Sequence, residues 1–221
     1  MTQNRTLHLL NGQSMYDYFK RTHFLDGELL IPFNEAMCYG DTNDDIFSPQ
    51  FSQVRAKVHH VTLEQYTEIT LKPLKLFLDK NFTHLSLWFD VDMFCQINVL
   101  TILGWLDQTD YKGEIELHIV GDKYELMDHL SLKAEGYYSI YKKVLIRKEM
   151  PKHILPAFLK SGIELYLNYL SQNSELIRYI NKFKNLSEEM LVSKLIVEFT
   201  HYGLGDRQYL EMLNRVGRSK I

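Results

Sequence analysis

The chain has 221 residues and a net charge of −3, with 25 Lys and Arg residues against 28 Asp and Glu residues. Apolar residues make up 45% of it and charged residues 24%, which is ordinary for a globular protein and enough to bury a core. This balance argues against a broad electrostatic surface for nucleic acid, so we do not expect a nucleic-acid partner.

The cysteines and the apolar runs set the expected compartment. Cys38 and Cys95 form no CxxC pair, so we expect neither a disulfide framework nor a zinc ribbon. No run approaches the roughly 18 apolar residues of a membrane span, and the N-terminal residues lack the apolar core of a signal peptide. We therefore expect a cytoplasmic protein with reduced thiols and no membrane partner.

Strands and helices alternate in the pattern of the first two thirds of the chain. In chain order we predict a strand at 7–10, a helix from Ser14, a strand at 28–33, a polar loop at 34–45, helices near 48–60 and 62–80, a strand at 85–89, a helix at 93–106 and a strand at 114–120. Pro73 is a candidate kink in the second of the paired helices. This alternation predicts one mainly parallel sheet, with the first strand central and the helix 93–106 packed on one face.

The remainder of the chain is predicted to be mostly helical. The basic stretch 141–148 is compatible with a last short strand or with a linker. From Pro151 onward the apolar spacing is helical, with Ser187 and Asp206 as expected helix caps. We predict a Rossmann-like three-layer α/β domain over residues 1–148 and a helical C-terminal region over residues 149–221.

Four pieces of the sequence carry a family resemblance: LHLLNGQS (7–14), IPFNEAMCYGD (31–41), Arg55 and LWFDVDMFCQINVLTILGWL (87–106). The last is the most specific, because the aromatic-acid-Phe-Cys-Gln-Asn run after a strand is unusual. Together they resemble an uncharacterised bacterial family, domain of unknown function 1835, over about the first 125 residues. The resemblance implies a fold and a set of site positions rather than a reaction.

Two positions depart from the pattern of that family. Its first loop usually reads Asn-Gly-Asp-Ser, and Gln13 stands here in place of the acid. Its second loop usually carries an Arg-Asp or Arg-Glu pair, where this chain has Asn34-Glu35. If those positions perform acid–base work in relatives, this chain performs it differently or not at all.

Three polar loops are expected to meet at the carboxyl ends of the strands, where open parallel sheets bind ligands. They are residues 11–14, 34–41 and 90–96. The candidate ligand-binding residues are Asn11, Gly12, Ser14, Asn34, Glu35, Arg55, Asp90, Asp92 and Gln96. We expect six of them to converge in one concavity: Asn11, Ser14, Glu35, Asp90, Asp92 and Gln96.

Each of these loops also has a purely structural interpretation. Asn11 or Ser14 could cap a helix, and the single glycine of NGQS makes neither a Walker loop nor a GxGxxG fingerprint. Asp90 and Asp92 could join other acids in a cluster that binds a divalent metal or raises one pKa for general acid work. We favour a cap and a solvated turn acid instead, and we expect no metal site.

Cys95 is expected in the first turn of the helix that Asp92 caps. The helix dipole lowers the pKa of such a thiol, whereas the carboxylates of Asp90 and Asp92 and burial among apolar neighbours raise it. The carboxylates and burial together raise the pKa of the thiol more than the helix dipole lowers it. We therefore predict a protonated, buried and unreactive Cys95.

The expected function is binding of a small polar or phosphorylated ligand at the strand ends, with a nucleotide as one candidate. Hydrolytic or transferase chemistry and the cofactor are left open, and a homodimer is a candidate assembly. The alternative is a regulatory or interaction module whose C-terminal helices bind a protein partner or nucleic acid. Residues 187–216 are compatible with a helix-turn-helix carrying Arg207 and Arg215, with Arg218 and Lys220 beyond it, although a packing hairpin is favoured.

Overall fold

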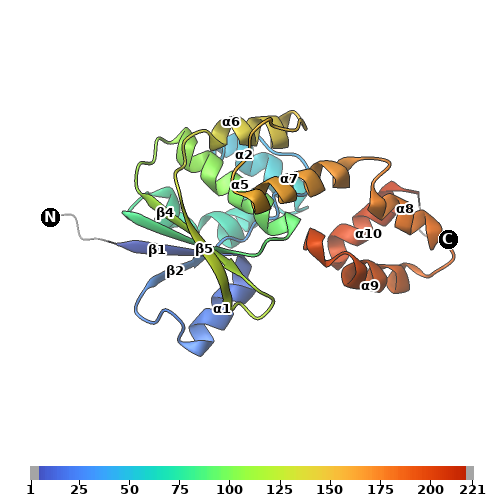
Figure 1. The fold of residues 1–221 in the computed structure, drawn as a ribbon, viewed down its shortest axis with the longest axis horizontal. Coiled ribbons are helices and arrows are strands. Elements are labelled where there is room, and N and C mark those ends of the chain that lie inside the picture. Colours follow the sequence, from blue (N-terminus) through green and yellow to red (C-terminus); the bar gives the residue numbers. More distant parts are fainter. Residues whose placement is uncertain (1–4, 218–221) are drawn as a thin grey trace.

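The computed structural model describes residues 5–217, which form a sheet flanked by helices (Figure 1). The strands are β1 (Thr6–Leu10), β2 (Leu29–Pro32), β3 (His84–Phe89), β4 (Glu114–Val120) and β5 (Leu126–Leu132). The α-helices are α1 (Gly12–Thr22), α2 (Pro49–Val58), α3 (Leu63–Tyr66), α4 (Lys75–Leu78), α5 (Met93–Gln108), α6 (Tyr137–Tyr141), α7 (Ala157–Leu170), α8 (Glu175–Lys182), α9 (Glu188–Glu198) and α10 (Asp206–Arg215). Two π-helical turns, η1 (Thr67–Leu71) and η2 (Lys142–Ile146), and a 3₁₀ turn, η3 (Thr200–Tyr202), complete them.

The five strands lie in the order β2-β1-β3-β4-β5. The pairs β1/β2, β1/β3 and β3/β4 are parallel, which confirms the predicted three-layer α/β fold. β1 is internal, between β2 and β3, and β3 occupies the centre. The chain turns from β1 to β2 on one side and then crosses to β3 on the other. The carboxyl ends of β1 and β3 therefore flank the topological switch point, where ligands bind in such sheets.

Helix α5 forms the centre of the larger hydrophobic core. Figure 1 shows α1 on one face of the sheet and α2, α5 and α6 on the other, as predicted for residues 93–106. Every residue from Met93 to Leu106 except Phe94 is buried, because α5 contacts β3 together with α6 and α7. A helix that is apolar all round must be enclosed in this way.

One strand and one helical stretch differ from the prediction. Residues 126–132 form β5, an edge strand antiparallel to β4, and most of its side chains are exposed. Its sequence alternates polar and apolar residues only over its last four positions, so the sequence pattern did not predict the strand. Residues 141–148, predicted as a strand or a linker, lie in α6, η2 and the turn after it. Tyr141, Val144 and Leu145 recur at helical spacing and are buried.

The helix predicted over residues 62–80 is divided into α3, η1 and α4. Pro73 lies in the turn between η1 and α4, where its missing backbone N–H interrupts the helical hydrogen bonds. The break is therefore larger than the kink that was expected.

The C-terminal helices begin with α7, which packs on α5, and continue into α8, α9 and α10 (Figure 1). Ser187 caps α9 by accepting from the Met190 N–H, as predicted. Asp206 is the first residue of α10 rather than its cap, and Gly205 holds the cap position. Arg218 and Lys220 lie outside the described residues. Across residues 5–217, the helices are too short or too polar to span a bilayer.

Candidate functional site

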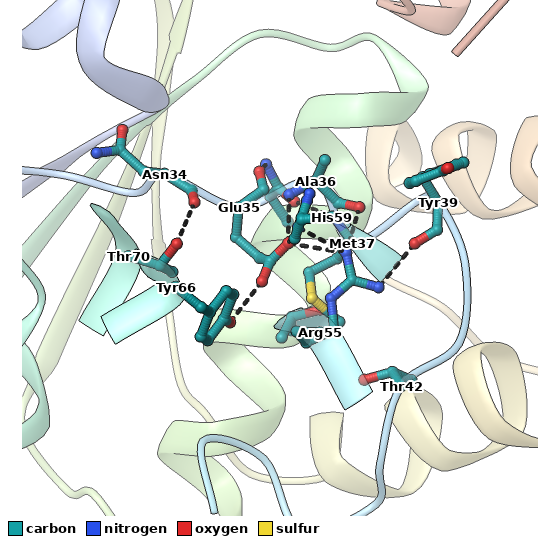
Figure 2. Close-up of polar contacts among 12 residues, drawn as sticks. Asn34, Glu35, Ala36, Met37, Tyr39, Thr42, Arg55, His59, Tyr66 and Thr70 are labelled. Carbon is teal, nitrogen blue, oxygen red and sulfur yellow. Dashed lines mark hydrogen bonds and ion pairs between the residues drawn. The ribbon is translucent and has the colours of Figure 1, made fainter. Parts of the chain in front are cut away.

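A buried ion pair lies just past the carboxyl end of β2 (Figure 2). The side chains of Glu35 and Arg55 are both 0% exposed, and Arg55 Nη2 donates to Glu35 Oε1 at 2.8 Å. The same guanidinium donates to the carbonyl oxygens of Ala36, Tyr39 and Asp41 at 2.7–2.9 Å. The planar guanidinium of Arg55 therefore fixes the loop after β2 through hydrogen bonds to its backbone carbonyl groups.

Glu35 binds two further side chains besides Arg55. His59 Nε2 lies 2.6 Å from Oε1, and the Tyr66 hydroxyl donates to Oε2 at 2.6 Å. Burial alone raises the pKa of Glu35, but Arg55 and the hydrogen bonds from His59 and Arg55 outweigh it and hold that pKa well below its usual range. Burial and the charge of Glu35 raise the pKa of Tyr66, so its hydroxyl stays protonated and donates. The carboxylate is thus ionised and fully hydrogen-bonded.

A small pocket of about 170 Å³ opens beside this cluster. We call it the His59 pocket; it is lined by Asn34, His59, Val61, Tyr66, Ile69, Thr70 and Arg207. The side chain of His59 is 21% exposed, whereas that of Glu35 is 0% exposed. His59 therefore connects the buried carboxylate to the pocket.

Asn34 and Arg207 join the His59 pocket to the rest of the molecule. Asn34 Nδ2 donates to the Ile69 carbonyl at 3.1 Å and lies 3.4 Å from Gln13 Oε1, in the first turn of α1. The Thr70 hydroxyl donates to the Asn34 carbonyl at 3.0 Å. Ile69 and Thr70 belong to η1, a π-helical turn of the kind that often occurs at functional sites. Arg207 reaches in from α10 and donates to the His59 carbonyl at 2.8 Å.

The side chains at the switch point between β1 and β3 bind one another. Asn11 Nδ2 donates to Cys95 Sγ at 2.9 Å, and Asn98 Nδ2 lies 3.3 Å from Asn11 Oδ1. Asn98 also donates to the Glu35 carbonyl at 3.0 Å and accepts from the Met37 N–H. Asn98, which is not among the candidate residues, therefore links Asn11 to the loop of Glu35.

Asp90 and Asp92 precede α5, and Gln96 lies in its first turn. Asp92 caps the helix by accepting from the Cys95 N–H at 2.7 Å, as predicted. Gln96 is 0% exposed and donates to the Asp90 carbonyl at 2.6 Å. A Cβ on Gly203 would lie 2.4 Å from the Asp92 carboxyl carbon, so the turn before α10 covers this end of β3. Asp92 is therefore a helix cap, as the structural interpretation predicts, whereas Asp90 is half-buried rather than solvated.

The six residues expected to converge do not share one open concavity. Asn11 and Glu35 are joined through Asn98, but Glu35 and Gln96 are buried. Ser14 is exposed in the first turn of α1, and Gly12, with φ of 83°, begins that helix. Asn34 reaches the His59 pocket, and Arg55 lies behind it.

Sequence reasoning missed the pocket-lining residues His59, Tyr66, Thr70 and Arg207. One local signal points to His59, because it follows Arg55 by four positions and so shares a helix face with it. Nothing local points to Arg207, which is 148 positions from His59 in the chain. Within residues 5–217, no group of three or more His, Cys, Asp and Glu side chains is arranged to hold a metal ion.

The cap residue Asp92 lowers the free energy of unfolding by an amount that depends on pH. Burial, opposed in part by hydrogen bonds from the Cys95 N–H and aided by Asp90, raises the pKa of Asp92 to about 6. Between the unfolded value and about 6 the folded state binds more protons, so this group lowers stability as the pH rises through that window.

Replacing Asp92 with Asn is expected to raise the free energy of unfolding by about 1–2 kcal/mol near neutral pH and by much less near about pH 4. Asn keeps the capping oxygen and removes the desolvated charge. Urea unfolding of both proteins at the two pH values measures this. A loss of stability at neutral pH would contradict it, and Asp92→Ala, which also removes the cap, should destabilise by about 1 kcal/mol relative to Asp92→Asn.

Cys95 is expected to react slowly with thiol reagents in the native protein. It is 2% exposed, and burial together with the charge of Asp92 raises its pKa well above the usual range. Burial and Asp92 also raise the pKa of Cys38 to about 12. Labelling of a Cys38→Ser variant isolates Cys95; it should be slow near neutral pH and accelerate on unfolding. Rapid native labelling would contradict the buried, protonated thiol.

No family model matches the chain, and neither a curated protein nor a solved structure is significantly similar to it. The resemblance to the domain of unknown function 1835 family therefore stays a prediction. The fold and the site define an α/β protein with a buried ion pair beside a small pocket at the carboxyl edge of its sheet.

Proposed function

We propose that the chain binds a small anionic ligand, a carboxylate or a phosphate monoester, in the His59 pocket. The observation that carries the proposal is the pairing of two groups on this pocket. His59 is held from behind by the ionised Glu35, and the guanidinium of Arg207 lines the same space. The pocket follows the end of β2, at the edge of the sheet where α/β proteins bind their ligands.

Charge favours an anion in this pocket. Among its lining residues, Arg207 is the permanently charged one, and its Nε lies 3.8 Å from Glu211 of α10, which is not part of the lining. The charge of Glu35, which lies behind His59, is balanced by Arg55 at 2.8 Å. The volume of about 170 Å³ is below the roughly 300–1,000 Å³ of sites for drug-sized molecules, which favours a ligand of few heavy atoms.

The cluster also orients His59 before a ligand arrives. A carboxylate that engages one imidazole nitrogen fixes the orientation of the ring. Because Nε2 is engaged by Glu35, Nδ1 is the ring nitrogen left to contact a ligand. When both ring nitrogens carry protons, Nδ1 donates a hydrogen bond to an anion in the pocket.

Titration calorimetry with inorganic phosphate and with acetate tests the proposal. Replacing Arg207 with Ala, or His59 with Asn, is expected to weaken binding by about tenfold or more, because each change removes a hydrogen-bonding group. The matched control is Arg178→Ala on α8, which removes an exposed arginine bonded to the Asn173 carbonyl. Equal losses in the control, or no binding of either anion at about 10 mM, would contradict the proposal.

One observation also favours the alternative, a regulatory module. Arg207 belongs to α10 and binds the His59 carbonyl, so a ligand in the pocket would contact both the sheet domain and the C-terminal helices. Ligand binding would then stabilise the packing of α10 against the segment that contains His59. Hydrogen exchange of the α10 amides should slow when phosphate is added; unchanged exchange would count against this role.

A further inference from the structure

A second set of cavities is lined in part by the loop that Arg55 holds. Two cavities, of about 440 and 320 Å³, share Asp41, Val58 and Lys148 and therefore adjoin. We call them together the basic groove. It runs between α2, the turn after η2 and the C-terminal helices, and its charged lining residues are Asp41, Lys57, Lys148 and Arg215.

The residues that line the basic groove carry a net positive charge. It has three cations and one carboxylate, and each cation comes from a different part of the chain. Among the described residues, no ion pair joins Lys57 or Arg215 to a carboxylate. An anion entering the groove would therefore meet positive charge that no other group has neutralised.

Lys148 supplies an independent observation. Its ammonium donates to the Leu145 carbonyl at 2.7 Å and to the Tyr166 hydroxyl at 2.8 Å, so both of its acceptors are neutral. The residue is exposed overall, but these contacts hold the ammonium against the protein. Burial lowers the pKa of Lys148, and the charge of Asp41 opposes this shift more strongly than the charge of Arg55 adds to it. An ammonium has three N–H donors, so one remains for a ligand.

We propose that the basic groove binds a small molecule carrying two or more phosphates, of the nucleoside diphosphate or triphosphate class. Lys148 and Arg215 bind the phosphates from opposite walls, and Lys57 adds charge at one end. A ligand with several phosphates fits better than a single anion, because the cations are distributed along two adjoining cavities. This site is separate from the His59 pocket, with which it shares no lining residue.

Calorimetric titration of the full chain with ATP, and with adenosine as the phosphate-free probe, tests the proposal. ATP is expected to bind and adenosine to bind at least about tenfold more weakly. Lys148→Met and Arg215→Ala are each expected to weaken ATP binding by about tenfold, and both should leave phosphate binding in the His59 pocket unchanged. Because Arg215 is exposed, its variant keeps the fold even if Lys148→Met is destabilised.

The matched control is Lys20→Met, on α1 at the opposite face of the sheet (Figure 1). It should change ATP affinity by less than about twofold. The proposal is overturned if ATP does not bind at about 1 mM, if adenosine binds as tightly as ATP, or if Lys20→Met weakens binding as much as Arg215→Ala. Tighter binding of a ten-nucleotide DNA than of ATP would also overturn it, in favour of a nucleic-acid surface.

Discussion

Replacing Arg55 with Met is expected to lower the free energy of unfolding by about 3–5 kcal/mol, because it leaves the Glu35 carboxylate buried without its cation. The Arg55 side chain is 0% exposed, and its guanidinium also binds three backbone carbonyls of the loop after β2. Chemical unfolding near neutral pH measures the loss. The matched control, Arg178→Met, removes an exposed arginine and should cost less than about 0.5 kcal/mol.

The pH dependence of the same variant separates an unpaired charge from a simple loss of packing. In the wild type the pKa of Glu35 is lowered, so its contribution is present above the unfolded value of 4.5 and is lost as the pH falls below it. Without Arg55, burial dominates and raises the pKa of Glu35. Protonation of Glu35 should therefore reduce the loss of stability in the variant. The difference in the free energy of unfolding between variant and wild type should therefore become smaller towards about pH 4. A constant gap would contradict the buried ion pair as its cause.

Replacing Gly162 with Val is the second change with a large expected effect, a loss of about 2–3 kcal/mol. Gly162 lies in α7, and a Cβ there would lie 2.5 Å from the Cβ of Gln96 on α5. Glycine inside a helix normally costs stability, so a side chain should help wherever space allows. Here the contact between the two helices outweighs that propensity.

The matched control is Ser161→Val, one residue earlier in α7 and exposed. It adds the same β-branched side chain without the contact, so it should change stability by no more than about 0.5 kcal/mol. Unfolding curves of both variants give the comparison. Equal effects would mean that α7 does not pack on α5 through Gly162, and that the C-terminal helices are attached in another way.

Local patterns predicted the parts of the fold that bury side chains. Leu85–Phe89 and Met93–Leu106 are mostly apolar, which is typical of the centre of a sheet and of an enclosed helix such as α5. Asp92 was predictable as a cap because a capping residue acts on N–H groups two or three positions away. β5 was not predictable, since an exposed edge strand needs no buried face.

The candidate site was predictable only in part, because it depends on contacts between distant segments. The end of β2 places Asn34 and Glu35 correctly at the carboxyl edge. However, α2 brings His59, α3 brings Tyr66 and α10 brings Arg207. The sequence gives no sign that Asp92 and Gln96 would be covered by the turn at Gly203 and by Gly162, because that covering depends on the packing of α7 and α10.

The most direct test of the anion site is a map of backbone amide chemical shifts while inorganic phosphate is added to the ¹⁵N-labelled protein. We expect the largest, saturable changes at Asn34, His59, Tyr66, Thr70 and Arg207, with amides of α1 near Lys20 unchanged. The same titration of Arg207→Ala should show these changes only at higher phosphate concentration. Changes spread over exposed lysines and arginines, or none around His59, would contradict the proposed ligand site.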